Sequence, residues 1–222
     1  MIMSGDVAVE GIEHPKPGLK VAGDSVIRVK KRPKYVGRGG FKLEGALDAF
    51  DFSPKGKVAL DIGASTGGFS DCLLQRGASR IYTLDVGTNQ LAWKLRSDER
   101  MVVRENFNAR YLTPDDLAEE IDLIVVDVSF ISLTLILGPA FSVLREQGDL
   151  ICLIKPQFEL AREDVGKGGI VRDEALRQTA VEKIRRFIIE DLAKHWHKIV
   201  PSPISGTNGN QEYLAWLKHE SD

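Results

Sequence analysis

Cysteine is scarce in this sequence, with two among 222 residues, and no Cys-x-x-Cys pair occurs. Because Cys72 and Cys152 each stand inside an apolar run, we expect two small buried side chains rather than metal ligands. So few thiols exclude a disulfide-stapled scaffold and suit a reducing cytoplasm. The sequence also lacks the basic and then apolar stretches that predict a signal peptide. We therefore expect a cytoplasmic protein that holds no metal.

The sequence also has no large excess of charge of either sign, since it contains 30 Lys and Arg and 32 Asp and Glu. Apolar residues make up 43% and charged residues 28%, which excludes collagen-like and disordered chains. The balance hides two unlike regions. Residues 1–44 hold nine basic and five acidic side chains, whereas residues 45–222 hold 21 and 27. A near-zero net charge therefore does not exclude a nucleic acid partner.

Long apolar runs are limited to residues 123–144, where Asp127 is the sole charged residue. The run is long enough to cross a bilayer. However, residues 123–128 are short and β-branched, as in a buried parallel strand, and residues 133–144 resemble a buried helix. A strand followed by a helix fits the neighbouring pattern, so we expect no stable membrane insertion.

That neighbouring pattern is an alternation of strands and helices. Strands are predicted at residues 58–62, 80–85, 101–104, 121–127, 150–154, 196–200 and 212–217. Helices are predicted at residues 68–76, 89–95, 133–144 and 172–194, and another begins after Thr113, with Pro114 at its first position. The alternation predicts an α/β fold with a seven-stranded, mostly parallel sheet and helices on both faces.

A glycine-rich turn follows the first of these strands, directly after Asp61. Glycines at the carboxyl end of a strand let the backbone approach a ligand. The spacing fits neither the dinucleotide fingerprint nor the phosphate loop. Asp85 ends the second strand, where it suits a ribose diol, and acids at both strand ends are typical of S-adenosylmethionine enzymes. The predicted cofactor-binding residues are Asp61, Gly63, Ala64, Ser65, Gly67, Gly68, Phe69, Asp85 and Asn108.

Further charged residues stand at the remaining strand ends. Asp127 ends the fourth strand, Lys155 ends the fifth, Glu212 opens the last, and Lys42 lies just before the sheet. A lysine that ends an apolar strand is costly to bury without a use or a partner. Two readings stay open, a catalytic group or a salt-bridged rim in which Lys155 pairs with Asp127. Motifs of the Asn/Asp-Pro-Pro-Tyr type, which serve amino-group methylation, are missing, and this favours an oxygen acceptor.

The first 30 residues predict small strands broken by glycine and proline, too few to build a core alone. We expect residues 31–44 to form a basic linker. Cations with one aromatic residue suit a phosphate backbone and a stacked base, although a solvated connector would have the same composition. The candidate RNA contacts are Arg28, Lys30, Lys31, Arg32, Lys34, Tyr35 and Arg38.

Five motifs carry a resemblance to a known family, at residues 35–43, 61–69, 127–132, 155–159 and 166–173. Together they resemble the hemolysin A (TlyA-type) family of FtsJ-like ribosomal RNA 2′-O-methyltransferases. The resemblance implies a Rossmann-like class I methyltransferase domain over residues 45–222 and S-adenosylmethionine as cofactor. It also implies ribosomal RNA or a ribosomal subunit as partner, with a cytidine 2′-hydroxyl as acceptor.

The same resemblance implies a catalytic tetrad of Lys42, Asp127, Lys155 and Glu212. In that scheme Lys155 accepts or steers the hydroxyl proton and Asp127 orients it, while Lys42 and Glu212 hold the ribose and the lysine geometry. A small-molecule O-methyltransferase and a membrane-active cytolysin, as the family's name suggests, remain alternatives.

Residues 1–30 resemble the second half of an S4-type RNA-binding domain. The helical first half is missing, and Glu10 stands where that module usually has Asn. We therefore expect weakened RNA binding and a sequence that begins inside the module, either as a truncated chain or through a start codon assigned too late. The oligomeric state is not predicted.

Overall fold

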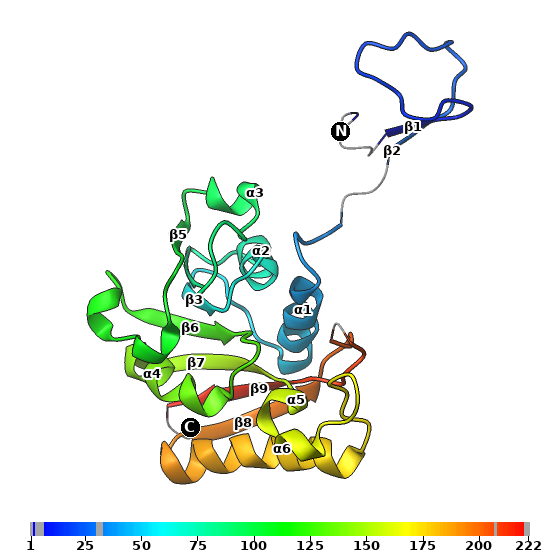
Figure 1. The fold of residues 1–222 in the computed structure, drawn as a ribbon. Coiled ribbons are helices and arrows are strands. Elements are labelled where there is room, and N and C mark those ends of the chain that lie inside the picture. The colour runs from blue at the N-terminus through cyan, green and yellow to red at the C-terminus, as the bar shows by residue number, and fades with distance from the viewer. Residues whose placement is uncertain (1, 3–6, 30–32, 207, 220–222) are drawn as a thin grey trace. The chain divides into compact units, whose positions relative to one another are not determined.

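The computed structural model describes residue 2 and residues 7–29, 33–206 and 208–219. The chain divides into two compact units, with the boundary between Lys34 and Tyr35 (Figure 1). The predicted start of the methyltransferase domain at residue 45 lies ten residues beyond this boundary. The assignment of residues 1–30 to half of an S4-like module stays a prediction.

The N-terminal unit contains two short antiparallel strands, β1 (Val7–Val9) and β2 (Ile27–Val29). Most of its large apolar side chains are exposed, among them Leu19, Val26 and Ile27. The unit therefore has little core of its own, as its composition predicts.

The larger unit is built on a seven-stranded sheet in the order β5-β4-β3-β6-β7-β9-β8 (Figure 1). All neighbouring strands pair in parallel except β9, which runs antiparallel to β7 and β8. This confirms the mostly parallel sheet. The strands are β3 (Val58–Ile62), β4 (Arg80–Leu84), β5 (Met101–Arg104), β6 (Ile121–Val126), β7 (Leu144–Ile154), β8 (His195–Pro201) and β9 (Tyr213–Lys218).

Two buried clusters lie on opposite faces of the sheet, because successive strand residues point to opposite sides. Along β3, Ala59 packs in one cluster and Leu60 in the other. The first face is covered by α1 (Gly39–Phe50), α2 (Gly68–Gln75) and α3 (Trp93–Arg96). The second is covered by α4 (Leu137–Val143) and α6 (Glu174–Arg186), which continues as a π-helical turn. The prediction of helices on both faces is confirmed.

Helix α1 differs from the predicted linker over residues 31–44, because the helix begins at Gly39. Paired glycines and basic neighbours conceal the helix in the sequence. Its stability comes from an apolar stripe, Leu43, Ala46, Leu47 and Phe50, which is buried at helical spacing. Gly40 is required at the start of the helix, since a β-carbon there would lie 2.3 Å from the Tyr35 ring.

Two other predicted helices are shorter than expected. Residues 89–95 give only the start of α3, and the chain after Thr113 forms one 3₁₀ turn, Pro114–Asp116. The turn has the predicted cap, since Asp116 accepts from the Thr113 backbone and hydroxyl. No apolar stripe follows the cap to extend the helix, and none of Pro114–Asp116 is buried.

The apolar run at residues 123–144 forms β6, a 3₁₀ turn and α4, as the strand-and-helix interpretation predicts. Helix α4 has seven residues. Within the described part of the chain, every helix is too short or too polar to span a membrane.

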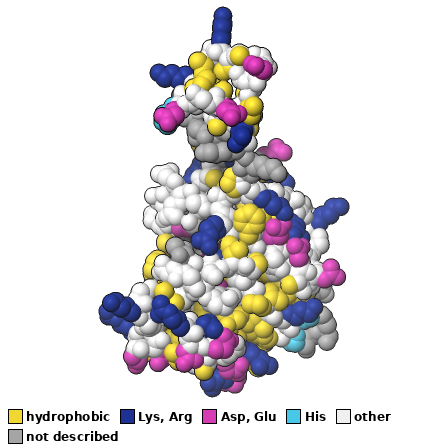
Figure 2. Space-filling view, turned by 90° about the vertical axis from the view of Figure 1, so that its right-hand side faces the viewer, with side chains coloured by type: hydrophobic (Ala, Val, Ile, Leu, Met, Phe, Trp, Pro, Cys, Tyr) yellow, Lys and Arg dark blue, Asp and Glu magenta, His cyan; other side chains and the backbone are white. Residues whose placement is uncertain are grey.

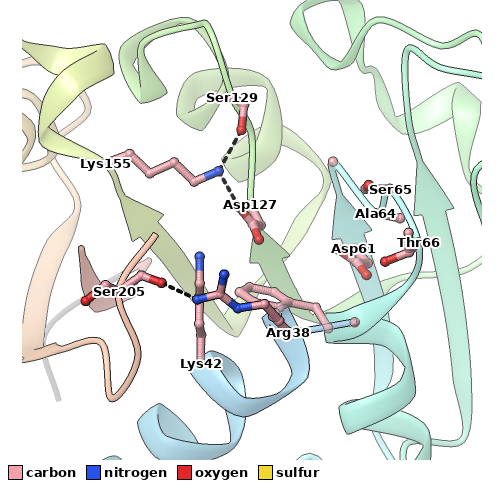
Figure 3. Close-up of a pocket in the computed structure, with 14 residues that line it drawn as sticks. Arg38, Lys42, Asp61, Ala64, Ser65, Thr66, Asp127, Ser129, Lys155 and Ser205 are labelled. Carbon is pink, nitrogen blue, oxygen red and sulfur yellow. Dashed lines mark hydrogen bonds and ion pairs between the residues drawn. The ribbon is translucent and has the colours of Figure 1, made fainter. Parts of the chain in front are cut away.

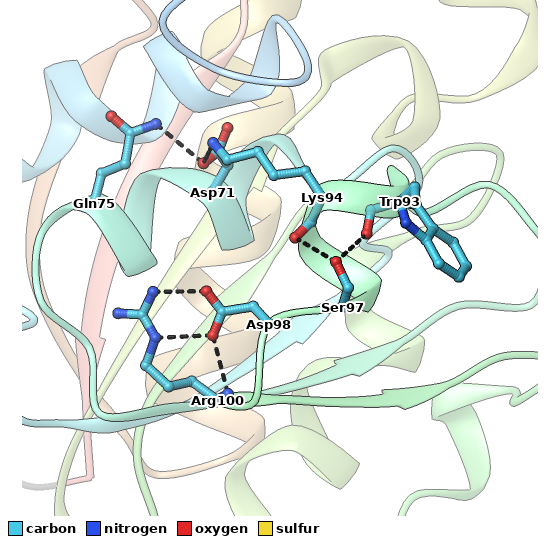
Figure 4. A network of polar contacts seen from close by, with 7 residues as sticks. All are labelled: Asp71, Gln75, Trp93, Lys94, Ser97, Asp98 and Arg100. Carbon is cyan, nitrogen blue, oxygen red and sulfur yellow. Dashed lines mark hydrogen bonds and ion pairs between the residues drawn. The ribbon is translucent and has the colours of Figure 1, made fainter.

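A buried carboxylate ties the segment before α1 to the rest of the sheet's first face. Asp71 on α2 is 1% exposed and accepts from the Val36 backbone N–H at 2.9 Å. It also accepts from Lys94 at 3.1 Å and from Gln75 at 3.0 Å (Figure 4). Asp71 therefore fixes both α3 and the start of the segment that leads into α1.

Candidate active site

The charged strand ends meet at one edge of the sheet. The strand order reverses between β3 and β6, because the chain continues from β3 to β4 and β5 on one side and from β6 to β7 on the other. Open α/β sheets bind ligands at the carboxyl ends of the strands where the order reverses in this way. Asp61 lies on β3, Asp127 follows β6 and Lys155 follows β7. Because β9 is antiparallel to β7, its first end lies at the same edge, and Glu212 stands directly before it.

A cavity of about 220 Å³ opens at this edge (Figure 3). Its wall includes Lys42 from α1, Asp61 from β3, Asp127 and Ser129 from the chain after β6, and Lys155 from the end of β7. The structure thus brings three of the four predicted catalytic residues to one cavity, and the fourth, Glu212, contacts one of them.

Lys155 is held at the cavity by two neighbours. Its Nζ lies 2.6 Å from Asp127 Oδ1 and donates to Ser129 Oγ at 2.8 Å (Figure 3). The ion pair proposed for a salt-bridged rim therefore exists, but it faces a cavity. Ser129 is absent from the predicted site. Its signal in the sequence is its place two residues after Asp127, at the end of an apolar strand.

The second lysine forms a second buried pair. Lys42 Nζ lies 2.5 Å from Glu212 Oε2, and Glu212 is 2% exposed. The loop before β9 passes so close that a β-carbon at Gly206 would lie 2.4 Å from Glu212 Oε1. Glu212 itself is therefore enclosed, and its lysine partner is the member of the pair that reaches the cavity wall.

Arg38 also lies on this wall, although the sequence places it among RNA contacts. Its Nη2 donates to the Ser205 carbonyl oxygen at 2.9 Å, and its side chain extends beside Lys42 (Figure 3). Arg38 is exposed at the cavity mouth. Such a position suits a cation that contacts a phosphate next to a bound nucleotide.

Asp61 is the most enclosed carboxylate of the site, with no exposed surface. Its Oδ2 accepts from the Ser70 hydroxyl at 2.6 Å and from the Ser70 backbone at 3.0 Å. Its Oδ1 has no partner among the described residues. Burial is the main cause that raises the pKa of Asp61 to about 7; the Ser70 bonds oppose it, and Asp127 and Asp85 add to it. An unpaired buried oxygen at a cavity suits a cationic donor.

The glycine-rich turn lets two strand ends approach each other. Gly63 has φ +83°, and a β-carbon there would lie 2.5 Å from the Asp127 carbonyl oxygen. In the same turn the Ser65 backbone donates to Asp85 Oδ2 at 2.7 Å, and Gly87 donates to Oδ1 at 2.7 Å. Each carboxylate oxygen of Asp85 keeps a further acceptor position, which two ribose hydroxyls could fill.

A second cavity, of about 350 Å³, continues the first. The two share four wall residues, Gly63, Ser65, Asp127 and Ser129. The second cavity adds a carboxylate, an amide and apolar side chains, namely Asp85, Asn108, Phe107, Val128, Phe130 and Ile131. The combined groove suits a ligand with a cationic end, a diol and a flat apolar ring.

Most of the predicted cofactor residues line this groove. Asp61, Gly63, Ala64, Ser65, Gly68 and Phe69 line the first cavity, and Asp85 and Asn108 line the second. Gly67 instead stands at the N-cap of α2 with φ +94°.

The predicted RNA contacts are scattered. Arg28 and Lys34 are exposed in the N-terminal unit, and Lys30, Lys31 and Arg32 lie outside the described residues. Tyr35 is 3% exposed, packs edge-on against Phe41 and donates its hydroxyl to Glu44 at 3.0 Å. A ring so enclosed has no free face for a base, so Tyr35 belongs to the packing of α1 rather than to an RNA surface.

The fold and site define a doubly wound α/β enzyme with a groove of two connected cavities beside two lysine–carboxylate pairs. A family model described as FtsJ-like methyltransferase matches residues 35–219. The chain is 41% identical to the 16S/23S rRNA (cytidine-2′-O)-methyltransferase TlyA of Mycobacterium tuberculosis, over 100% of this chain and 83% of that protein. It is 45% identical to hemolysin A of Brachyspira hyodysenteriae, over 97% and 90% of the two chains.

A solved structure from Lactococcus lactis is also similar, with 48% identity and a TM-score of 0.82 over 85% of this chain and 90% of that one. The chain therefore belongs to the FtsJ-like methyltransferase family, in the branch that contains hemolysin A and TlyA.

Proposed function

We propose that this chain transfers the methyl group of S-adenosylmethionine to a ribose 2′-hydroxyl of ribosomal RNA. The observation that carries the proposal is the groove in which a nucleoside-sized cavity opens onto Lys155–Asp127 and Lys42–Glu212. The name of the Mycobacterium tuberculosis relative supports the same substrate, including cytidine as the acceptor nucleotide. We place the reaction in the cytoplasm, on ribosomal RNA or a ribosomal subunit.

The groove fits the methyl donor at three points. Asp61 offers an unpaired buried oxygen to an ammonium group, Asp85 offers acceptors to a ribose diol, and Phe107 supplies an apolar wall for an adenine ring. The bound donor supplies a methyl group already activated by its sulfonium. What remains for the protein is to place the acceptor oxygen and to handle its proton.

The two lysines do this work from two different elements of the cavity wall, α1 and the end of β7. Lys155, fixed by Asp127 and Ser129, steers the proton of the attacking hydroxyl. Lys42, fixed by Glu212, holds the ribose. Both lysines are enclosed, at 8% and 9% exposure, so their ammonium groups have few positions other than the observed ones.

The RNA itself has a stacking surface at the mouth of the groove. Phe130 is 91% exposed and adopts φ +64°, a conformation that costs free energy for a residue with a bulky side chain. Its ring lies 5.1 Å from that of Phe158, centroid to centroid. We assign Phe130 to stacking on the target nucleobase and Arg38 to an adjacent phosphate.

On the face drawn in Figure 2, individual cations rather than a broad basic patch would supply the RNA contacts of the larger unit. On the face in Figure 2, positive and negative side chains are interspersed over this unit. The cations of residues 28–34 would add contacts outside the catalytic domain.

The test is transfer of a radiolabelled methyl group from S-adenosylmethionine to intact ribosomal subunits and to naked ribosomal RNA. We expect label in RNA with wild-type protein and none with Lys155→Ala. If label enters only small hydroxylated molecules, the acceptor is a small molecule rather than ribosomal RNA. Leakage of dye from liposomes at comparable protein concentration would instead favour the membrane-active alternative.

A further inference from the structure

A buried carboxylate outside the tetrad joins the two segments that carry the Lys155–Asp127 pair. Glu159 closes α5 (Pro156–Glu159), the short helix that begins directly after Lys155. It is 4% exposed and does not line either cavity of the groove. Its function is therefore not contact with a bound substrate.

The partners of Glu159 lie on the chain that follows Asp127. Its Oε1 accepts from the Leu133 backbone N–H at 2.8 Å, and its Oε2 accepts from the Ser132 hydroxyl at 2.5 Å. Lys183 of α6 lies 3.5 Å from Oε2 and also donates to the Glu159 carbonyl oxygen at 2.6 Å. A buried anion thus accepts two hydrogen bonds from the segment that carries Asp127 and Ser129.

These contacts give that segment its second anchor. At its first end, the Asp127 backbone N–H donates to the Ile62 carbonyl oxygen at 2.9 Å. At its other end, Ser132 and Leu133 are held by Glu159. Between the anchors stands Phe130 with its positive φ, a strained conformation that persists only where the surroundings fix it.

We propose that Glu159 is a positioning residue that holds the Asp127–Ser132 segment in register with Lys155. The two segments meet at two places: at the site, through Lys155 with Asp127 and Ser129, and behind it, through Glu159 with Ser132 and Leu133. Loss of the rear contact lets Asp127 and Phe130 shift relative to the lysine. This inference rests on the proposed methyl transfer.

The experiment compares Glu159→Ala with Glu159→Gln and Ser132→Ala in the full chain. The alanine variant should lower kcat about 100-fold, since a displacement of roughly 1 Å at a reacting centre costs that much. Its affinity for S-adenosylmethionine should stay within about threefold of wild type. Glutamine should restore most of kcat, because its amide can replace both bonds and the Ser132 hydroxyl can accept as well as donate.

Asp149→Ala is the matched control. Asp149 is also buried and also accepts one N–H and one lysine, but it stands on β7 at the opposite edge of the sheet. If Glu159 serves stability alone, both alanine variants will lower kcat equally, or cofactor affinity will fall together with kcat in Glu159→Ala. Either result overturns the proposal, as does an alanine variant with unchanged kcat.

Hydrogen–deuterium exchange supplies a readout that needs no activity. Exchange over residues 128–136 should accelerate in Glu159→Ala and, more weakly, in Ser132→Ala, and it should not change in Asp149→Ala. If the wild-type protein fails to methylate RNA, the proposed function is wrong, whereas unchanged exchange over this segment shows that Glu159 does not hold it. The two failures are therefore distinguishable.

Discussion

Buried charges have different partners at the two edges of the central sheet, which are formed by the two ends of its strands. At the edge where β7 begins to pair with β9, Asp149 accepts from Trp216 Nε1 at 2.9 Å and from Lys57 at 3.2 Å, so both of its oxygens have a partner. At the other edge, Asp61 leaves one buried oxygen without a partner in the described structure, and two enclosed lysines line a cavity. Both edges hold enclosed carboxylates, but among the described residues a buried carboxylate oxygen without a partner lies only at the second edge.

Asp149 has all its partners within the fold, whereas Asp61 has an oxygen that a bound ligand could pair. A buried polar atom without a partner raises the free energy of the folded protein, and a ligand that supplied a partner for Asp61 would remove this cost. Lys155 and Lys42 differ from both of these carboxylates. Each lysine is paired with one carboxylate and still reaches the cavity wall.

The largest expected effect is on the rate of methyl transfer when Lys155, at the cavity, is replaced. Lys155→Ala should reduce methyl transfer by about 10²–10⁴-fold, the range typical of a lost proton-handling group. The affinity for S-adenosylmethionine, measured by titration calorimetry, should stay within about threefold of wild type. Loss of cofactor binding in this variant would place Lys155 in the donor site instead.

The reverse outcome is expected for Asp61→Asn, which removes the acceptor charge but keeps the shape. Cofactor affinity should fall about 10–100-fold, in line with the loss of a hydrogen bond to a charged group. The cofactor-free variant should melt at a higher temperature than wild type at pH 8, because no charge is then buried at this position. Unchanged affinity would contradict the role of the unpaired oxygen.

A smaller effect is expected at the mouth of the groove. Phe130→Ala should weaken RNA affinity about tenfold, since one base stacked on an aromatic ring contributes roughly 1–3 kcal/mol. Cofactor affinity should not change. Phe130→Tyr preserves a stacking ring and is the matched control, so equal losses in both variants would argue against stacking.

The pH dependence of cofactor binding follows from Asp61, whose pKa of about 7 lies above its ordinary value of 3.8. Its ionised form destabilises the free protein, so this group lowers the stability of the cofactor-free fold as pH rises from about 4 to about 7. An ammonium ligand needs that ionised form. Affinity should therefore rise as pH increases from about 5 to about 7, and it should fall again above about pH 8, where the α-ammonium group of the donor loses its own proton. Calorimetry with Asp61→Asn should show no rise below pH 7, and a wild-type affinity that falls between pH 5 and pH 7 contradicts this assignment.

The smallest effect on activity is expected at the opposite edge. Asp149→Ala should destabilise the fold by about 1–3 kcal/mol, because the Trp216 N–H and Lys57 lose their acceptor. Its kcat and its cofactor affinity should equal those of wild type at a temperature where both proteins are folded. Denaturant unfolding measures the first change, and a kinetic defect in the folded variant would remove the distinction between the edges.

The sequence predicts much of this arrangement because strand-end acids and lysines stand out after apolar runs. Asp61, Asp127 and Lys155 were located by that signal, and a parallel sheet necessarily brings such ends to one edge. Thr113 and Pro114 likewise predict the start of a helix, although only one 3₁₀ turn forms there.

What escaped prediction depends on contacts between distant segments. Gly39 and Gly40 conceal the start of α1, and the need for glycine at position 40 comes from packing against Tyr35. The same packing takes Tyr35 out of reach of RNA. Ser129 and Glu159 are ordinary polar residues in the sequence, and their partners become evident only when β6 and β7 lie side by side.

The most direct test of the central claim is the position of the methyl group on the product nucleoside. Ribosomal RNA treated with the protein and S-adenosylmethionine is digested to nucleosides and analysed by mass spectrometry with fragmentation at the glycosidic bond. If the two lysines at the cavity edge hold a ribose hydroxyl, as we propose, the ribose fragment gains 14 mass units, about one methyl group. A methyl group on the base fragment would contradict this proposal.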